Sequence, residues 1–141
     1  MGMYDNSYWN AMDKESVLQY ISPQYLGISS RHFEKQLPAL QARLRLGAKN
    51  VELGFMGKGK GSIQGNITPG MHSKTEREEM RQLAKINEVS LTTHATANAI
   101  GYAGFSDRGF NEDKRVKDVI EVKRAIDFAA DVAGGGAVVI H

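Results

Sequence analysis

The chain of 141 residues is 41% hydrophobic and 24% charged, which fits a soluble globular protein with one core. Its formal net charge of +2 is too small to require a polyanionic partner. Without cysteine it has no disulfide or thiolate metal site, and no apolar run reaches the roughly 20 residues of a membrane span. A cytoplasmic location without membrane contact is the default expectation.

The first part of the chain predicts a lead-in segment followed by a strand and a helix. Residues 1–22 contain a short amphipathic stretch, which we expect to close one end of the fold. Residues 25–29 predict a strand, and Ser29 or Ser30 is expected to cap a helix that runs to Leu46.

The same strand and helix pattern then recurs along the chain. Further strands are predicted near residues 50–55, 89–95 and 137–141. A capping box at Ser73–Glu76 predicts the start of one helix, and apolar residues at helical spacing predict another from Asp113 to Ala133. Strands that alternate with helices indicate a parallel sheet with right-handed crossovers.

The two faces of the strands favour a barrel over a doubly wound sheet. One face is apolar, as at Val51 and Leu53, whereas the other is small or polar, as at Glu52, Thr92 and His94. Strands of doubly wound sheets are usually apolar on both faces. The polar residues also gather toward the C-terminal strand ends, where barrels place their sites. We therefore expect residues 23–141 to form the N-terminal half of a (β/α)8 TIM-type barrel, either a fragment or a separately made half.

Two histidines occupy equivalent positions at the ends of consecutive strands. His94 ends the predicted third strand and His141 the fourth, and both fall on the polar face. Parallel neighbours lie about 4.8 Å apart, so the two imidazoles can reach one metal ion. The alternative is a pair of hydrogen-bonded core histidines, and the residues alone leave both interpretations open. His32 and His72 fall in predicted loops and receive no role.

The segments around these histidines resemble the xylose-isomerase-like TIM barrels, which include endonuclease IV and many sugar isomerases and epimerases. The resemblance covers residues 24–141 and rests on Leu91–His94, a helix with Lys123–Ile126, a glycine break and Val138–His141. Gly47–Leu53 is similar to the second-strand motif of the isomerase branch. The resemblance implies that His94 and His141 are metal ligands. The chain departs from the endonuclease IV pattern at Ala95–Ala97, and the ligands that later strands supply in the family are absent.

Other polar residues are candidates for supporting roles. Glu52 is a candidate ligand or a partner that orients one, and it is equally a carboxylate paired with a lysine or water. Ser29 and Asn98 are candidate substrate contacts. Lys58 and Lys60, in a glycine-rich loop, are candidates for contact with a phosphate, although a solvated loop has the same composition. Gly61 stands where a P-loop requires serine or threonine, which excludes that nucleotide-binding motif.

Three functions follow as expectations. The first is part of a divalent-metal enzyme, with zinc or manganese, that acts on phosphodiesters of nucleic acid and is inactive alone. The second is a sugar or sugar-phosphate isomerase or epimerase, favoured by residues 51–53. The third is a non-catalytic half barrel that binds a partner, a second copy of itself or a missing C-terminal half. In each case we expect no metal to be held tightly by this chain alone.

Overall fold

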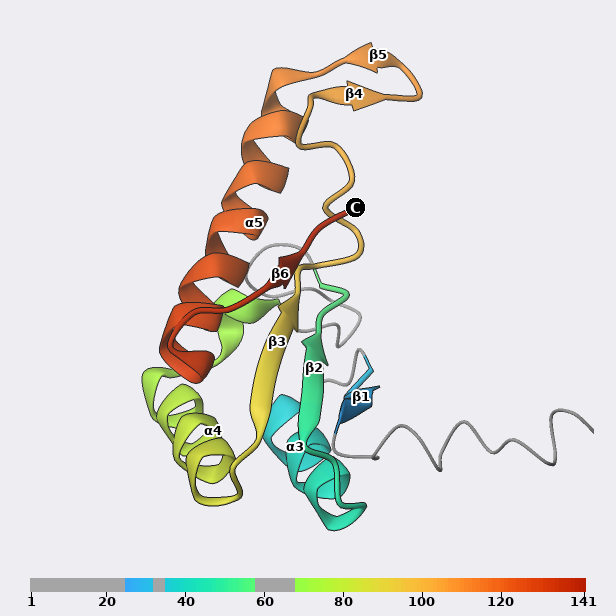
Figure 1. Ribbon diagram of the computed structural model, residues 1–141. Coiled ribbons are helices and arrows are strands. Elements are labelled where there is room, and N and C mark those ends of the chain that lie inside the picture. Colours follow the sequence, from blue (N-terminus) through green and yellow to red (C-terminus); the bar gives the residue numbers. More distant parts are fainter. Residues whose placement is uncertain (1–24, 32–34, 58–67) are drawn as a thin grey trace, which may run out of the picture.

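The computed structural model describes residues 25–31, 35–57 and 68–141, which form an α/β fold around a parallel sheet (Figure 1). The sheet contains β1 (Gly27–Ser29), β2 (Asn50–Gly54), β3 (Ser90–His94) and β6 (Val138–Val139), in that spatial order. All neighbouring strands are parallel. The prediction of four parallel strands in chain order is confirmed, and each strand is shorter than predicted. The lead-in segment, residues 1–22, lies outside the described residues.

Within the described ranges three α-helices follow the strands, and two of them begin or end as predicted. Helix α4 (Lys74–Ile86) starts with the predicted capping box, in which the Glu76 amide donates to Ser73 Oγ and the Ser73 amide to Glu76 Oε2. Helix α5 (Glu112–Ala133) ends at Gly134, whose φ of 71° is left-handed and therefore suits a residue without a Cβ. The short 3-10 helix η2 (Pro69–Met71) precedes α4.

The predicted serine cap of the first helix is wrong. Helix α3 (Gln36–Arg45) begins after Lys35, whose side chain forms no capping hydrogen bond. Ser30 Oγ instead donates to Gln36 Oε1 at 2.6 Å, and Gln36 Nε2 donates to the Gly54 carbonyl at 2.8 Å. Both side chains are fully buried, so this network ties the ends of β1 and β2 to the start of α3.

The central strands bury one face only, as predicted. Val51, Leu53 and Leu91 are buried in a core with residues of all three helices, namely Leu40, Met80, Ala84, Phe128 and Val132. On the opposite face Glu52, Thr92 and His94 are half-exposed. This open face holds a hollow of about 390 Å³ whose lining includes Ser29, Glu52 and Thr92.

The edge strands are less covered than their apolar residues predict. Leu26 and Ile28 at β1 and Ile140 beyond β6 are exposed, although large apolar side chains are normally buried. The reason is geometric: α3 packs on β2, and α5 packs chiefly on β3. Among the described residues, the helix layer therefore covers the middle of the sheet and leaves its two edges open.

An unpredicted antiparallel hairpin lies between β3 and α5. Strands β4 (Phe105–Ser106) and β5 (Gly109–Phe110) pair with Phe105 opposite Phe110. In Figure 1 the hairpin projects beyond the C-terminal ends of the strands, at the end of the molecule where α5 begins.

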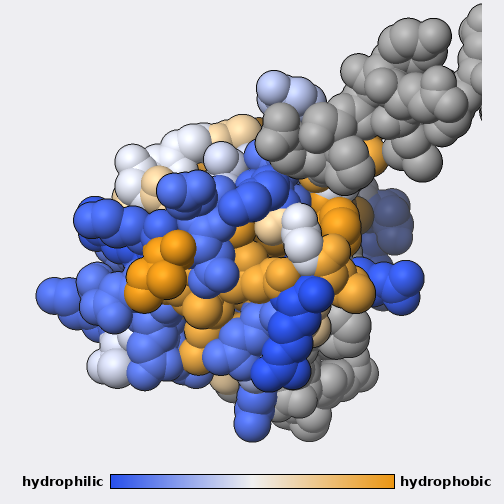
Figure 2. Space-filling model, turned by 60° about the horizontal axis from the view of Figure 1, so that its bottom comes forward, coloured by the Kyte–Doolittle hydropathy of each residue, from blue (hydrophilic) through white to orange (hydrophobic). Residues whose placement is uncertain are grey.

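The opposite end of the molecule, turned forward in Figure 2, exposes apolar side chains among hydrophilic ones. The exposed apolar residues of the described chain include Leu46 and Ile86, which stand at the C-terminal ends of α3 and α4. None of the helices in the described ranges is both long enough and apolar enough to cross a bilayer.

Candidate metal site

The structure brings His94 and His141 together. His94 is the last residue of β3, and the parallel pairing of β3 with β6 places His94 beside Val139. The side chain two residues beyond Val139 points to the same side of the sheet. The Nε2 atoms of His94 and His141 lie 2.9 Å apart, with ring centroids 4.7 Å apart and ring planes at 46°. The predicted juxtaposition of the two rings is therefore present.

The backbone fixes which nitrogen of His94 faces its partner. His94 Nδ1 lies 2.7 Å from the Ala95 carbonyl oxygen, which can only accept a hydrogen bond, so Nδ1 carries the proton of the neutral ring. The Nε2 atom then presents a lone pair, and the Nε2 proton of His141 is donated to it. A carbonyl behind one ring nitrogen is the arrangement that orients metal-ligating histidines.

The spacing of the two nitrogens fits a shared ion after a small movement. Two nitrogens bonded at about 2.05 Å to a tetrahedral zinc ion lie roughly 3.3 Å apart. The observed separation of 2.9 Å is a few tenths of an ångström less. His141 is exposed, so its side chain has room to move by this amount, and its proton must shift from Nε2 to Nδ1 before Nε2 can bind an ion.

Two imidazoles do not complete a metal centre. Within residues 25–31, 35–57 and 68–141, no group of three His, Asp or Glu side chains is placed to hold one ion. Glu52 shares the open face of the sheet, but its register partner in β3 is Thr92, two residues before His94. Glu52 therefore lines the neighbouring hollow with Ser29 and Thr92.

The other candidate residues make local contacts in the structure. Ser29 Oγ accepts from the Arg31 amide at 3.0 Å, which forms a turn after β1. Asn98 Nδ2 donates to the Met56 carbonyl at 2.6 Å and joins the loops that follow β2 and β3. Lys58 and Lys60 lie outside the described residues.

No protein-family model matches this sequence, and no curated protein matches it. The resemblance to the xylose-isomerase-like barrels therefore rests on the residues of the sequence alone.

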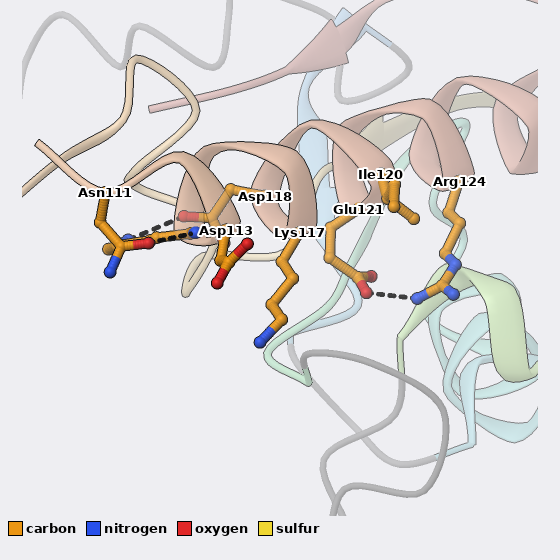
Figure 3. A pocket seen from close by; sticks show the side chains of 8 residues that line it. Asn111, Asp113, Lys117, Asp118, Ile120, Glu121 and Arg124 are labelled. Atoms are coloured by element: carbon orange, nitrogen blue, oxygen red, sulfur yellow. Dashed lines mark hydrogen bonds and ion pairs between the residues drawn. The ribbon is translucent and has the colours of Figure 1, made fainter.

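Sequence reasoning missed a buried carboxylate beside the loop that follows β3. Asp118, on α5, has no exposed surface, and its Oδ2 accepts from the Gly101 amide at 2.7 Å and from Lys114 Nζ at 2.8 Å. Figure 3 shows Asp118 beside a hollow of about 630 Å³ along α5, with Lys117 extending from the helix and Glu121 paired with Arg124. Lys114 and Asp118 are separated by four positions, which is the spacing of ion pairs on helix surfaces. The sequence pattern therefore did not predict that Asp118 is buried.

His72, which received no role, is a core residue. Its ring is buried, with centroids 5.7 Å from Phe55 and 5.6 Å from Phe128. Its Nε2 is buried and has no hydrogen-bond partner among the described residues. Burial lowers the pKa of His72 below its ordinary 6.5, and Arg77 adds to this effect while Glu76 opposes it.

We expect this histidine to make the protein less stable in mild acid. Since the folded state binds the proton less well than the unfolded state, the free energy of unfolding falls as the pH drops below about 6.5. Urea unfolding between pH 7.5 and 5 should show this slope, and His72→Phe should reduce it. His94→Ala should retain it. An unchanged slope in His72→Phe would assign the effect to other groups.

Proposed function

We propose that this sheet is one half of a (β/α)8 barrel of the xylose-isomerase-like type, and that His94 and His141 hold a divalent ion, zinc or manganese, that acts on phosphodiesters. The observation that carries the proposal is the 2.9 Å approach of two Nε2 atoms at the C-terminal ends of adjacent parallel strands. Barrel enzymes gather their site residues at this end. The one-sided helix layer and the polar opposite face agree with a barrel lumen.

The residues of this chain would orient and retain the ion rather than complete its coordination. The Ala95 carbonyl holds the His94 ring with Nε2 toward the site, and the adjacent strand brings His141 to the same point. When bound, a divalent ion supplies Lewis acidity and lowers the pKa of a coordinated water. We assign phosphate contacts to Lys58 and Lys60. Ser29 and Asn98, the candidate substrate contacts, lie at the C-terminal end of the sheet.

Strands that complete the barrel would supply the remaining ligands. In the described structure β1 and β6 each have a partner on one side only, so both edges of the sheet are open to further strands. Neither edge strand carries the charged residues or proline with which proteins commonly block an edge. A second copy of this chain or a C-terminal half is therefore the proposed partner.

A sugar isomerase is the second candidate, favoured by the hollow that Glu52 lines on the same open face of the sheet as His94. A carboxylate near a metal-bound sugar can transfer a proton between carbon atoms. In the completed barrel, Glu52→Gln would abolish such a proton transfer, whereas a phosphodiesterase that uses Glu52 only to line the hollow would retain activity.

Zinc titration by calorimetry tests the site. We expect weak binding with one ion per chain, because only two protein ligands are present, and no detectable binding in His94→Ala or His141→Ala. Glu79→Ala, which removes an exposed carboxylate on α4, is the matched control and should bind as the unaltered chain does. Equal zinc affinity in all four proteins would contradict the proposal.

A further inference from the structure

The hairpin β4–β5 presents two aromatic side chains to solvent. Phe105 is 71% exposed and Phe110 is 62% exposed, although large apolar side chains are normally buried. The two residues are cross-strand partners, with ring centroids 6.0 Å apart in an edge-to-face arrangement. The rings therefore form one small aromatic surface, on a hairpin that projects from the end of the sheet that bears the histidine pair (Figure 1).

The rings are held in place by the backbone of the hairpin. A Cβ on Gly104 would lie 2.4 Å from Phe110 Cε2, so this ring packs directly on the glycine. The Asn111 amide donates to the Gly104 carbonyl at 2.7 Å, and Ser106 Oγ donates to the Gly109 carbonyl at 2.9 Å. A ring fixed in this way loses little freedom when a flat ligand stacks on it.

The base of the hairpin is anchored to α5 at both of its ends. Asn111, which follows β5, caps the helix by accepting from the Lys114 amide at 2.8 Å. Asp118 holds the Gly101 amide before β4, and the Gly101 carbonyl accepts from the Gly104 amide at 2.8 Å. The aromatic surface is thus part of the rigid fold rather than a loose loop.

The size of this surface favours a flat ligand over a protein. A stable protein interface buries about 800 Å² on each partner and involves some 20–30 residues, far more than two rings on a four-residue ribbon supply. Exposed aromatic rings of single-strand-binding proteins stack on nucleobases. Arg108 lies in the turn between the strands, and the neighbouring Asp107 offsets its charge.

We propose that an unpaired nucleobase of a single-stranded nucleic acid binds at Phe105 and Phe110, stacked on the face of one ring with its edge toward the other ring. The choice of ligand rests on the proposed function, because the phosphodiester of such a strand would reach the histidine pair at the same end of the sheet. Since Asp107 offsets Arg108, base stacking rather than net charge supplies the affinity at this hairpin.

Fluorescence anisotropy with a labelled twelve-residue oligothymidylate tests the proposal. We expect Phe110→Ala and Phe105→Ala each to weaken binding about tenfold. Gly104→Ala retains both rings but displaces Phe110, so it should also weaken binding. Ile86→Ala, which removes an exposed apolar side chain at the opposite end of the molecule, is the control and should leave binding unchanged.

An abasic strand of the same length and charge separates stacking from phosphate attraction. The unaltered protein should bind it at least as weakly as Phe110→Ala binds the thymidylate. Equal affinity for both strands, or no binding of either, would overturn the proposal. Adsorption of the unaltered protein to phosphatidylcholine vesicles that Phe105→Ala abolishes, without base-dependent binding, would reassign the surface to lipid.

Together with the zinc titration, this experiment distinguishes a failure of the stacking proposal from a failure of the proposed function. Zinc binding by the two histidines without base-dependent oligonucleotide binding would overturn the stacking proposal and leave the metal site standing. Base-dependent binding without any zinc binding would support stacking and overturn the metal site.

Discussion

Replacing Asp118 with alanine should lower the free energy of unfolding by about 3–5 kcal/mol. The carboxylate has no exposed surface and accepts hydrogen bonds from the Gly101 amide and from Lys114 Nζ. Its removal leaves the Lys114 ammonium group, which is only partly exposed, without this partner and the Gly101 amide without its acceptor. Urea unfolding followed by circular dichroism measures the loss.

Two further variants distinguish the loss of a buried carboxylate from the loss of any negative charge on α5. Asp118→Asn retains an acceptor for Gly101, so we expect a smaller loss, of about 1–3 kcal/mol. Glu112→Gln breaks the exposed ion pair with Arg115 on the same helix and should leave stability unchanged within error. If Asp118→Ala were no more destabilising than Glu112→Gln, the carboxylate would not anchor the loop.

Replacing Phe128 with alanine should cost about 3–5 kcal/mol. Its ring is fully buried, packs edge to face on Phe55 at 4.9 Å between centroids, and contacts His72. The guanidinium group of Arg77 lies 5.5 Å from the ring centroid and adds a cation–π contact. No neighbouring side chain of the described core can fill the space of a whole ring without a change of backbone position.

The same helix offers a matched control for this prediction. Ile126→Ala removes a side chain that is half-exposed to water, so its loss in the same urea experiment should be below about 1 kcal/mol. Phe128→Leu keeps much of the volume and should fall between the two. A loss in Phe128→Ala as small as that in Ile126→Ala would contradict the central position assigned to this ring.

The sheet could be predicted because its determinants are local and periodic. In β2, the alternation of apolar Val51 and Leu53 with polar Glu52 predicted which face of the sheet is buried. The same alternation along β3 placed His94 on the opposite, polar face. The approach of His94 to His141 follows from one further rule, the parallel register of neighbouring strands. The capping box of α4 was likewise predictable, since all of its atoms belong to four consecutive residues.

The hairpin and the buried polar residues depend on contacts that no periodicity encodes. Strands β4 and β5 have two residues each, too few for an alternation to appear. Ser30 was interpreted as a helix cap, but its hydroxyl group instead donates a hydrogen bond to Gln36 and accepts one from the Gly54 amide. In the sequence Asp118 resembles a surface charge, but in the structure the loop after β3 covers it.

Nuclear magnetic resonance of nitrogen-15-labelled histidine tests the metal site most directly, because it reports each ring nitrogen separately. As zinc is added, we predict that the Nε2 signals of His94 and His141 shift together, while His94 Nδ1 keeps the chemical shift of a protonated nitrogen bonded to the Ala95 carbonyl. The buried His72 should not respond. Zinc addition that left both Nε2 signals unchanged, or shifted only one of them, would contradict a shared metal site.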